Sequence, residues 1–303
     1  MSLPATYRPL SQNPVVVYLS GLSPASRETM SGCLNLLAQL LSGGQDALSL
    51  DWDQVRFQHT AALRANLCDR FGATTANKYL SALRGVLKAA HGLGQMSSED
   101  YTRAVQIKHI RGEALLRGRA LSGEEVAELL RVCRADPSAA GARDLAIVAV
   151  LWTLGLRRSE VCSLRLEDYA GESLKVHGKG NKTRLVPVTG EVALHLSEWL
   201  SRRGRTLGAL FCPVRKNGHP VVREMHPQVV FNLLKKRGKQ AGLSHFSPHD
   251  LRRTFISDLL DSGADISTIQ RLAGHSLVST TARYDRRGEE AKRKAVELRS
   301  LPK

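Results

Sequence analysis

The chain has few of the features that mark a secreted, membrane-bound or metal-dependent protein. Its five cysteines are scattered along 303 residues without a C-x-x-C pair, and an odd number does not suit a disulfide framework. The apolar run at 15–17 is too short to form a signal peptide. The longest apolar run, at 145–156, is too short to span a bilayer. We therefore expect a soluble protein of a reducing cytoplasm, with no membrane partner.

Motifs for metals and nucleotides are also missing. The sequence has no glycine-rich Walker loop, and no group of His, Cys and Asp residues has the spacing of a metal site. Internal repeats and low-complexity stretches are absent as well. The sequence motifs thus indicate neither a nucleotide cofactor nor a bound metal ion.

Acidic residues are scarce relative to basic ones. The chain has 44 Lys and Arg residues against 28 Asp and Glu residues, a formal net charge of +16 and a pI near 10.1. This balance favours a polyanionic partner, and nucleic acid is the commonest polyanion. Composition alone leaves open a ribosome-associated or merely basic protein. Hydrophobic residues make up 42% of the chain, which is enough to build one large domain or two ordinary ones.

Apolar residues recur mainly at helical spacing. One helix is expected to begin at Ser23-Pro24 and to end at Gly43-Gly44. Further helices are predicted at about 53–69, 75–91, 122–134, 142–154, 190–202 and 226–241. A hairpin is predicted with strands at 173–177 and 184–188 and a tight turn at 178–181. The pattern predicts a mainly α protein with a small antiparallel β-sheet, in the α+β class.

Basic residues gather on one face of the helix at 75–91, in the segment 106–121 and on the helix at 226–241. Such residues are either solvated or in contact with phosphates. We place a domain boundary in the second group and interpret 108–120 as a basic linker. The residues predicted to contact DNA are Arg84, Lys88, Lys108, Arg111, Arg117, Arg119, Lys235 and Lys236.

The stretch from 247 to 284 holds the densest set of chemically useful side chains. A serine–proline pair marks the start of a helix on which His249 and Arg252, three residues apart, face one site. Apolar residues on an adjacent stripe are expected to hold this helix to a core. A second short helix is expected to end at Gly274, because glycine is the preferred residue just past a helix.

Two further residues of interest follow this second helix. His275 comes directly after Gly274, and Ser276 is expected to cap a last turn or two that carries Tyr284. Each residue has an ordinary structural interpretation when it is taken alone, as a helix cap, a solvated charge or a packing residue. Their joint spacing favours a single reactive site.

Three strings in this stretch resemble the tyrosine recombinases, the phage-integrase family, and most closely its short Xer-type members. They are H-D-L-R-R-T-F, L-A-G-H-S and T-T-A-R-Y. The family's first arginine box is similar to G-L-R-R-S-E-V-C-S-L, its hairpin to G-K-G-N-K-T-R-L-V-P, and a helix of its core-binding domain to T-A-N-K-Y-L-S-A-L-R-G-V-L-K. Family members often have a histidine after the second arginine, where this chain has Arg253.

The resemblance implies a domain order and an activity. Residues 1–12 would form a flexible tail, 13–107 a helical core-binding domain, and 121–303 a catalytic domain with a tail helix. The implied protein is a site-specific recombinase that cleaves and rejoins duplex DNA through a 3′-phosphotyrosyl intermediate. Its reactions would be the integration, excision or resolution of DNA elements, and the protein itself would be a nucleoid-associated protein of a bacterial-type cytoplasm.

The resemblance also implies a role for each site residue. Tyr284 would be the nucleophile, and two arginines would hold the non-bridging phosphate oxygens. Lys179, with Lys182 as the alternative, would protonate the leaving 5′-oxygen. The implied catalytic set is Arg157, Lys179, His249, Arg252, His275 and Tyr284, with Glu160 in a supporting role.

Two other functions stay open beside recombination. One is a catalytically silent DNA-binding relative, against which the complete set of six residues argues. The other is a type IB topoisomerase, which shares the chemistry but relaxes supercoils as a monomer. A helical N-terminal domain and a short tail favour recombination.

The resemblance further implies an assembly. In the family the C-terminal segment typically docks on a neighbouring protomer, so we expect a homo-tetramer on paired DNA sites and a monomer in free solution. The apolar face of a predicted helix at 289–299 would make this contact. Folding of that helix back on its own domain is the alternative, and a second, partner recombinase stays possible.

Overall fold

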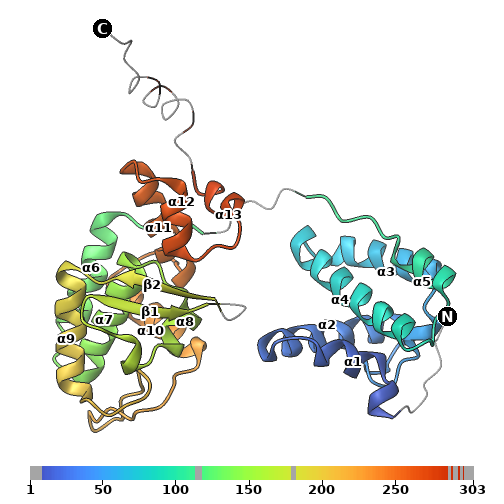
Figure 1. Cartoon of the computed structure of the whole chain (residues 1–303), viewed down its shortest axis with the longest axis horizontal. Coiled ribbons are helices and arrows are strands. Elements are labelled where there is room, and N and C mark those ends of the chain that lie inside the picture. Colours follow the sequence, from blue (N-terminus) through green and yellow to red (C-terminus); the bar gives the residue numbers. More distant parts are fainter. Residues whose placement is uncertain are drawn as a thin grey trace. The chain divides into compact units, whose positions relative to one another are not determined.

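The computed structural model describes residues 9–112, 118–178 and 182–285, together with the single residues 288, 293 and 296 (Figure 1). The chain divides into two compact units, 1–117 and 118–303. Helices predominate in both, and the sheet found among the described residues has two antiparallel strands. The predicted α+β class is confirmed.

The first unit is helical in its described part. Its helices are α1 (Pro14–Ser20), α2 (Pro24–Ser42), α3 (Phe57–Arg70), α4 (Ala73–Gly92) and α5 (Ser98–Val105), with short 3-10 turns at Leu10–Gln12 and Trp52–Gln54. The apolar face of α4 lies at the centre of the core, and α1 and α2 pack against it. The predicted end of α2 is confirmed, because Gly43 takes the left-handed φ of 78° that favours glycine.

In this unit one predicted helix boundary needs correction, and two short helices were not predicted. The helix expected at 53–69 begins only at Phe57, because the preceding residues form a separate 3-10 turn that buries the Trp52 ring. The short helices α1 and α5 were not predicted. Each has only a few residues and therefore shows little apolar periodicity.

The second unit contains the sheet and a larger helical core. Its helices are α6 (Gly123–Arg134), α7 (Ala139–Thr153), α8 (Arg158–Ser163), α9 (Gly190–Arg203), α10 (Pro227–Gln240), α11 (Pro248–Asp261), α12 (Ile266–Ala273) and α13 (Val278–Ala282), and a 3-10 turn lies at Leu166–Asp168. Helix α7 is buried along most of its length and packs against α6, α9 and α11. It forms the centre of this unit, as its continuous apolar run predicts.

The hairpin pairs β1 (Ser173–His177) with β2 (Thr183–Pro187), so that Val176 lies opposite Arg184. Val176 and Val186 are buried in the core of the unit. The predicted strands are confirmed to within one residue. The turn that joins them includes residues 179–181, which lie outside the described residues, so the predicted acid Lys179 is not described.

Several charged groups are buried within the second unit. Arg237 extends from α10 into the core, where it forms ion pairs with Asp136 and Asp144. Arg203 is also buried and bonds to backbone carbonyls. Basic runs in the sequence therefore contain both buried structural arginines and exposed lysines. The sequence pattern alone does not show which residues are buried.

All five cysteines are free thiols. No helix within the described ranges is both long and apolar enough to cross a membrane. Over the same part of the chain, no three or more His, Cys, Asp or Glu side chains are grouped so as to hold a metal ion.

Candidate active site

Helix α11 places two of the predicted residues on one face. Its start is a capping box, in which the Asp250 carboxylate accepts the backbone N–H of Ser247 at 2.9 Å, as the sequence predicts. One turn of the helix then separates His249 from Arg252. Leu251, which lies on the adjacent apolar stripe, is fully buried and fixes the helix against the core.

Three arginines from distant parts of the chain converge on the C-terminal end of α12. The hydrogen bonds run from Arg184 Nε to the Leu272 carbonyl (2.8 Å), from Arg252 Nη2 to the Ala273 carbonyl (2.7 Å) and from Arg157 Nη2 to the Gly274 carbonyl (3.0 Å). The last carbonyls of a helix have no partner within the helix and carry partial negative charge. The end of α12 is thus an anchor for guanidinium groups.

Gly274 makes this anchor possible and turns the chain toward His275. It ends α12 with a left-handed φ of 65°, as the sequence predicts. A Cβ at this position would lie 2.6 Å from Nη1 of Arg184, so a larger residue would displace the guanidinium. After the turn, the His275 Nδ1 lies 2.9 Å from the Thr281 hydroxyl.

Glu160 is a buried carboxylate between two of these arginines. It occupies the third position of α8, where one oxygen accepts the backbone N–H of Arg157 at 2.8 Å. Its oxygens also accept Arg157 Nη1 at 2.7 Å and both terminal nitrogens of Arg184 at 2.9–3.0 Å. Burial alone would raise the pKa of Glu160, but the hydrogen bonds from Arg184 and Arg157 outweigh it and hold that pKa below its usual range.

Tyr284 lies just after α13 and is 9% exposed. Its hydroxyl is 3.1 Å from Nε2 of His249, and its ring stacks on the ring of His275 at a centroid distance of 6.2 Å. The guanidinium carbon of Arg253 lies 5.6 Å from the centre of the tyrosine ring. The expectation for Ser276 is wrong: the cap residue of α13 is Leu277, and Tyr284 lies beyond the helix rather than in it.

The protonation of the site is set by burial and by its positive charges. Burial, together with the charges of Arg252 and Arg253, lowers the pKa of His249. Burial, then Arg252 and Arg157, lower the pKa of His275 to about 4. Both imidazoles are therefore neutral at neutral pH. Burial and the charge of Arg157 lower the pKa of Arg252 to about 10, which leaves that guanidinium charged.

A cavity of about 400 Å³ opens onto this cluster. Its lining includes Arg157, His249 and Arg252, with Arg158 and Phe231 at its side. The Arg157 side chain is 37% exposed, whereas Arg252 is only 2% exposed. One guanidinium is therefore accessible to a ligand while the other is fixed by its carbonyl contacts, an arrangement suited to a tetrahedral oxyanion.

The structure brings five of the six predicted catalytic residues into one neighbourhood, and the sixth, Lys179, lies outside the described residues. The sequence reasoning missed Arg184 and the contact of Arg253 with the tyrosine ring. Strand alternation carried a signal for Arg184, because it shares a face with the buried Val186 two residues later. An arginine at an inward position needs a partner, and here the partner is Glu160.

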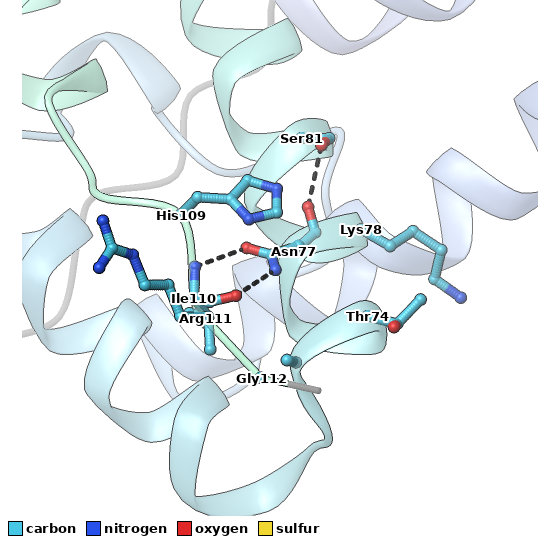
Figure 2. Close-up of a pocket in the computed structure, with 9 residues that line it drawn as sticks. Thr74, Asn77, Lys78, Ser81, His109, Ile110, Arg111 and Gly112 are labelled. Carbon is cyan, nitrogen blue, oxygen red and sulfur yellow. Dashed lines mark hydrogen bonds between the residues drawn. The ribbon is translucent and has the colours of Figure 1, made fainter. Parts of the chain in front are cut away.

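In the first unit, side chains of α3 and α4 hold the start of the predicted linker against the helices. The Asn77 side chain bonds both to the N–H of Ile110 at 2.9 Å and to its carbonyl at 2.8 Å, as Figure 2 shows. Arg64 Nε donates to the Lys108 carbonyl at 3.0 Å, and the Arg84 guanidinium donates to the Ile107 carbonyl. Residues 107–110 are therefore bound to this unit.

An open hollow of about 870 Å³ lies beside this segment, lined in part by Lys78, His109 and Arg111 (Figure 2). Of the residues predicted to contact DNA in the first unit, Lys88, Lys108 and Arg111 are exposed, whereas Arg84 makes the backbone contact described above. Arg117 lies outside the described residues.

In the second unit, Arg119 forms a two-pronged ion pair with Glu125 at 2.5 and 2.6 Å and also contacts Ser244. Lys235 and Lys236 are exposed on α10. The predicted DNA contacts thus divide into exposed cations, which can meet a phosphate directly, and arginines that already have protein partners.

Residues 119–290 match the sequence model of the phage integrase family. Tyrosine recombinase XerA of Pyrococcus furiosus is 36% identical over 186 residues, which cover 60% of this chain and 62% of that protein. Tyrosine recombinase XerC of Alcanivorax borkumensis is 31% identical over 284 residues, 90% of this chain and 87% of that protein. The chain spans about three fifths of the length of the first curated relatives it matches.

Two solved structures have the same fold. A lambda integrase dimer bound to a COC′ core site matches with a TM-score of 0.68 at 16% identity, over 97% of this chain and 96% of that one. The Tn1549 transposon integrase in complex with transposon right end DNA also matches with a TM-score of 0.68, at 14% identity, over 94% of this chain and 99% of that one.

Proposed function

The chain belongs to the phage integrase family, and from this premise we propose that it is a site-specific recombinase that cleaves and rejoins duplex DNA. The observation that carries the proposal is the placement of Arg157 and Arg252 at one cavity with His249, whose ring nitrogen lies 3.1 Å from the Tyr284 hydroxyl. This arrangement combines a nucleophile, a proton acceptor and two anion-binding groups.

The reaction begins with a scissile phosphate in the cavity. Each guanidinium has five N–H donors, so an arginine can anchor on carbonyls and still offer donors to phosphate oxygens. Arg157 and Arg252 stabilise the negative charge on the non-bridging oxygens in the transition state. His275 adds a hydrogen bond to one of them.

Tyr284 attacks the phosphorus in line with the leaving 5′-oxygen. A bond forms between the phenol oxygen and phosphorus, and the bond from phosphorus to the 5′-oxygen breaks. His249, neutral because its pKa is lowered, takes the phenol proton. Lys179 donates a proton to the leaving oxygen. The 3′-phosphotyrosyl ester retains the bond energy, so a 5′-hydroxyl from the partner strand reverses the step, and no nucleotide or metal cofactor enters it.

DNA binding is shared between the two parts of the chain. We assign the core-binding domain to 13–107, the linker to 108–120 and the catalytic domain to 121–303. The exposed Lys88, Lys108 and Arg111 and the α10 pair Lys235 and Lys236 contact phosphates. The net charge of +16 supports this assignment. Two neighbours in fold are described as integrases bound to DNA, which favours the same partner here.

Strand exchange needs several protomers. A lambda integrase tetramer bound to a Holliday junction matches this chain with a TM-score of 0.62 at 17% identity. By analogy, we assign this chain a homo-tetramer on paired sites and a monomer in free solution. We also assign it to the nucleoid, where it would act on mobile DNA elements. The predicted tail helix at 289–299 would join the protomers, but nearly all of it lies outside the described residues.

The substitution Tyr284→Phe tests the proposal. The variant is expected to bind target DNA normally and to form no covalent adduct on nicked suicide duplexes, because phenylalanine lacks the attacking oxygen. Tyr169→Phe is the matched control and is expected to form adducts at the wild-type rate.

Three results would count against the proposal. An adduct in Tyr284→Phe would move the nucleophile to another residue. A wild-type protein that binds DNA without forming any adduct would favour the catalytically silent alternative. Adducts accompanied by supercoil relaxation without recombinant products would favour the topoisomerase alternative.

A further inference from the structure

We propose that Arg184 is a positioning residue for DNA cleavage, which holds Glu160 and the end of α12 and thereby keeps the Arg157 guanidinium directed at the scissile phosphate. This inference rests on the proposed function and adds to it a residue outside the predicted catalytic set. It follows from the contacts of one guanidinium with both structures that orient Arg157.

All three nitrogens of the Arg184 guanidinium have partners at hydrogen-bond distance. Nη1 and Nη2 donate to the two oxygens of Glu160 at 3.0 and 2.9 Å, and Nε donates to the Leu272 carbonyl at 2.8 Å. Its side chain is only 14% exposed. A two-pronged bond to a carboxylate plus a third bond from Nε to another acceptor fixes both the position and the plane of a guanidinium. Arg184 is therefore a rigid connector between α8 and α12.

Arg157 depends on the same two elements. It contacts Glu160 through Nη1 at 2.7 Å and the Gly274 carbonyl through Nη2 at 3.0 Å. Its side chain is 37% exposed and lines the cavity, so it has more freedom than Arg184. Arg184 contacts both oxygens of the same carboxylate and, through Nε, the carbonyl of Leu272, two residues before Gly274. Arg184 thus holds in place the two groups, Glu160 and the end of α12, that orient the Arg157 side chain toward the cavity.

Charge balance explains why Arg184 controls the direction of Arg157. Glu160 is 4% exposed, and a buried carboxylate requires charged partners. With Arg184 present, Glu160 is shared between two arginines. Without Arg184, Arg157 would be the remaining ion-pair partner of Glu160 and would be drawn into a two-pronged pair with it. The guanidinium would then turn away from the cavity, and phosphate binding in the transition state would weaken.

Arg184 also belongs to β2, the strand that returns from the lysine-bearing turn. A competing role is therefore possible, in which Arg184 acts by fixing the hairpin for the proton donor. The two roles predict different responses to a substrate whose leaving group needs no proton. This difference is the basis of the experiment.

The experiment compares single-turnover cleavage by wild type, Arg184→Gln and Arg184→Lys on suicide duplexes with a 5′-bridging oxygen or a 5′-bridging sulfur. Both variants are expected to cleave about 10- to 100-fold more slowly on both substrates, the scale of a misplacement of about 1 Å. Their DNA affinity is expected to stay within about twofold of wild type, because other basic residues dominate binding. Lysine keeps the charge but not the fork, so it should not restore the rate. The matched control is Lys175→Gln, an exposed cation on the neighbouring strand, which should behave as wild type.

A double-substitution cycle with Glu160→Gln distinguishes a loss of Arg157 positioning from a general loss of structure at the site. Because both residues act through Arg157, the double variant is expected to cleave about as slowly as the slower single variant. Thermal melting of Arg184→Lys verifies that the chain is folded when it is assayed.

Three outcomes would overturn the inference: rescue on the sulfur substrate, multiplicative losses in the cycle, or wild-type cleavage by folded Arg184→Lys. If wild type forms adducts and an overturning outcome appears, only the role of Arg184 fails. If wild type forms none, the proposed function fails.

Discussion

The site arginines of the second unit and the exposed cations of the first unit differ in their surroundings. In the second unit, Arg252 is 2% exposed, donates to the carbonyls of Gly155 and Ala273, and lies within a set of three converging arginines. In the first unit, Lys88, Lys108 and Arg111 are exposed. An enclosed guanidinium has one fixed direction, whereas an exposed side chain is mobile and screened by salt. An enclosed guanidinium therefore suits a reaction step that needs a fixed geometry. Exposed cations suit DNA binding to which many residues contribute.

Arg252→Ala is expected to give the largest effect. Cleavage of a suicide duplex should fall by about 10²- to 10³-fold, the scale of losing one preorganised oxyanion donor. DNA affinity at moderate salt should change little. The measurement is single-turnover cleavage beside a gel-shift titration, with the exposed Arg205→Ala as the control. A folded Arg252→Ala that cleaves at the wild-type rate would mean that the enclosed arginine serves only the fold.

Substitution of Lys108 and Arg111 by Gln tests the exposed cations of the first unit, which we expect to contribute to DNA binding rather than to cleavage. The double variant should bind DNA more weakly, and the slope of log K against log salt should fall by up to about 1.8, since each phosphate contact contributes about 0.9. Cleavage at saturating protein should be nearly unchanged. Arg103→Gln is the control, because its guanidinium pairs with Glu99 on the same unit. An equal loss of slope in this control would remove the distinction between the proposed phosphate contacts and an exposed cation that is paired with Glu99.

The smallest effect concerns the pH dependence that follows from the burial of His275 beside the enclosed arginines. The pKa of His275 is lowered to about 4 in the folded protein, against an ordinary value of about 6.5. Between these values the unfolded chain binds a proton that the folded chain does not, so the free energy of unfolding should fall as pH drops from about 6.5 to about 4. Below about pH 4 this contribution should level off.

Denaturant unfolding of wild type and His275→Gln at pH 7, 6, 5 and 4.5 measures that contribution. The free energy of unfolding should fall less steeply with decreasing pH in the variant than in wild type. Parallel curves for the two proteins would show that His275 does not carry the effect. Because the lowered pKa of His249 acts in the same direction, some decline is expected to remain in His275→Gln.

Sequence patterns anticipated most of the local structure and much of the site. The capping box of α11, the end of α12 at Gly274 and the strands of the hairpin all follow from residues within one or two turns of each other. The spacing of His249 and Arg252 likewise follows from helix geometry. The last turn was predicted less well, since α13 ends before Tyr284. The position of Tyr284 instead follows from the packing of its ring against the ring of His275.

The sequence by itself determined the helical class and the family, and it predicted a set of reactive residues, because helix periodicity, caps and motif spacing are local properties of the chain. Only the tertiary structure decided which arginines are enclosed and which are exposed. Arg157 bonds to a carbonyl 117 residues away, and Arg184 reaches Glu160 across 24 residues. An arginine has a long apolar stem and a forked charge that can pair with phosphate, carboxylate or backbone carbonyl. Its role is therefore set by what the folded chain places within its reach.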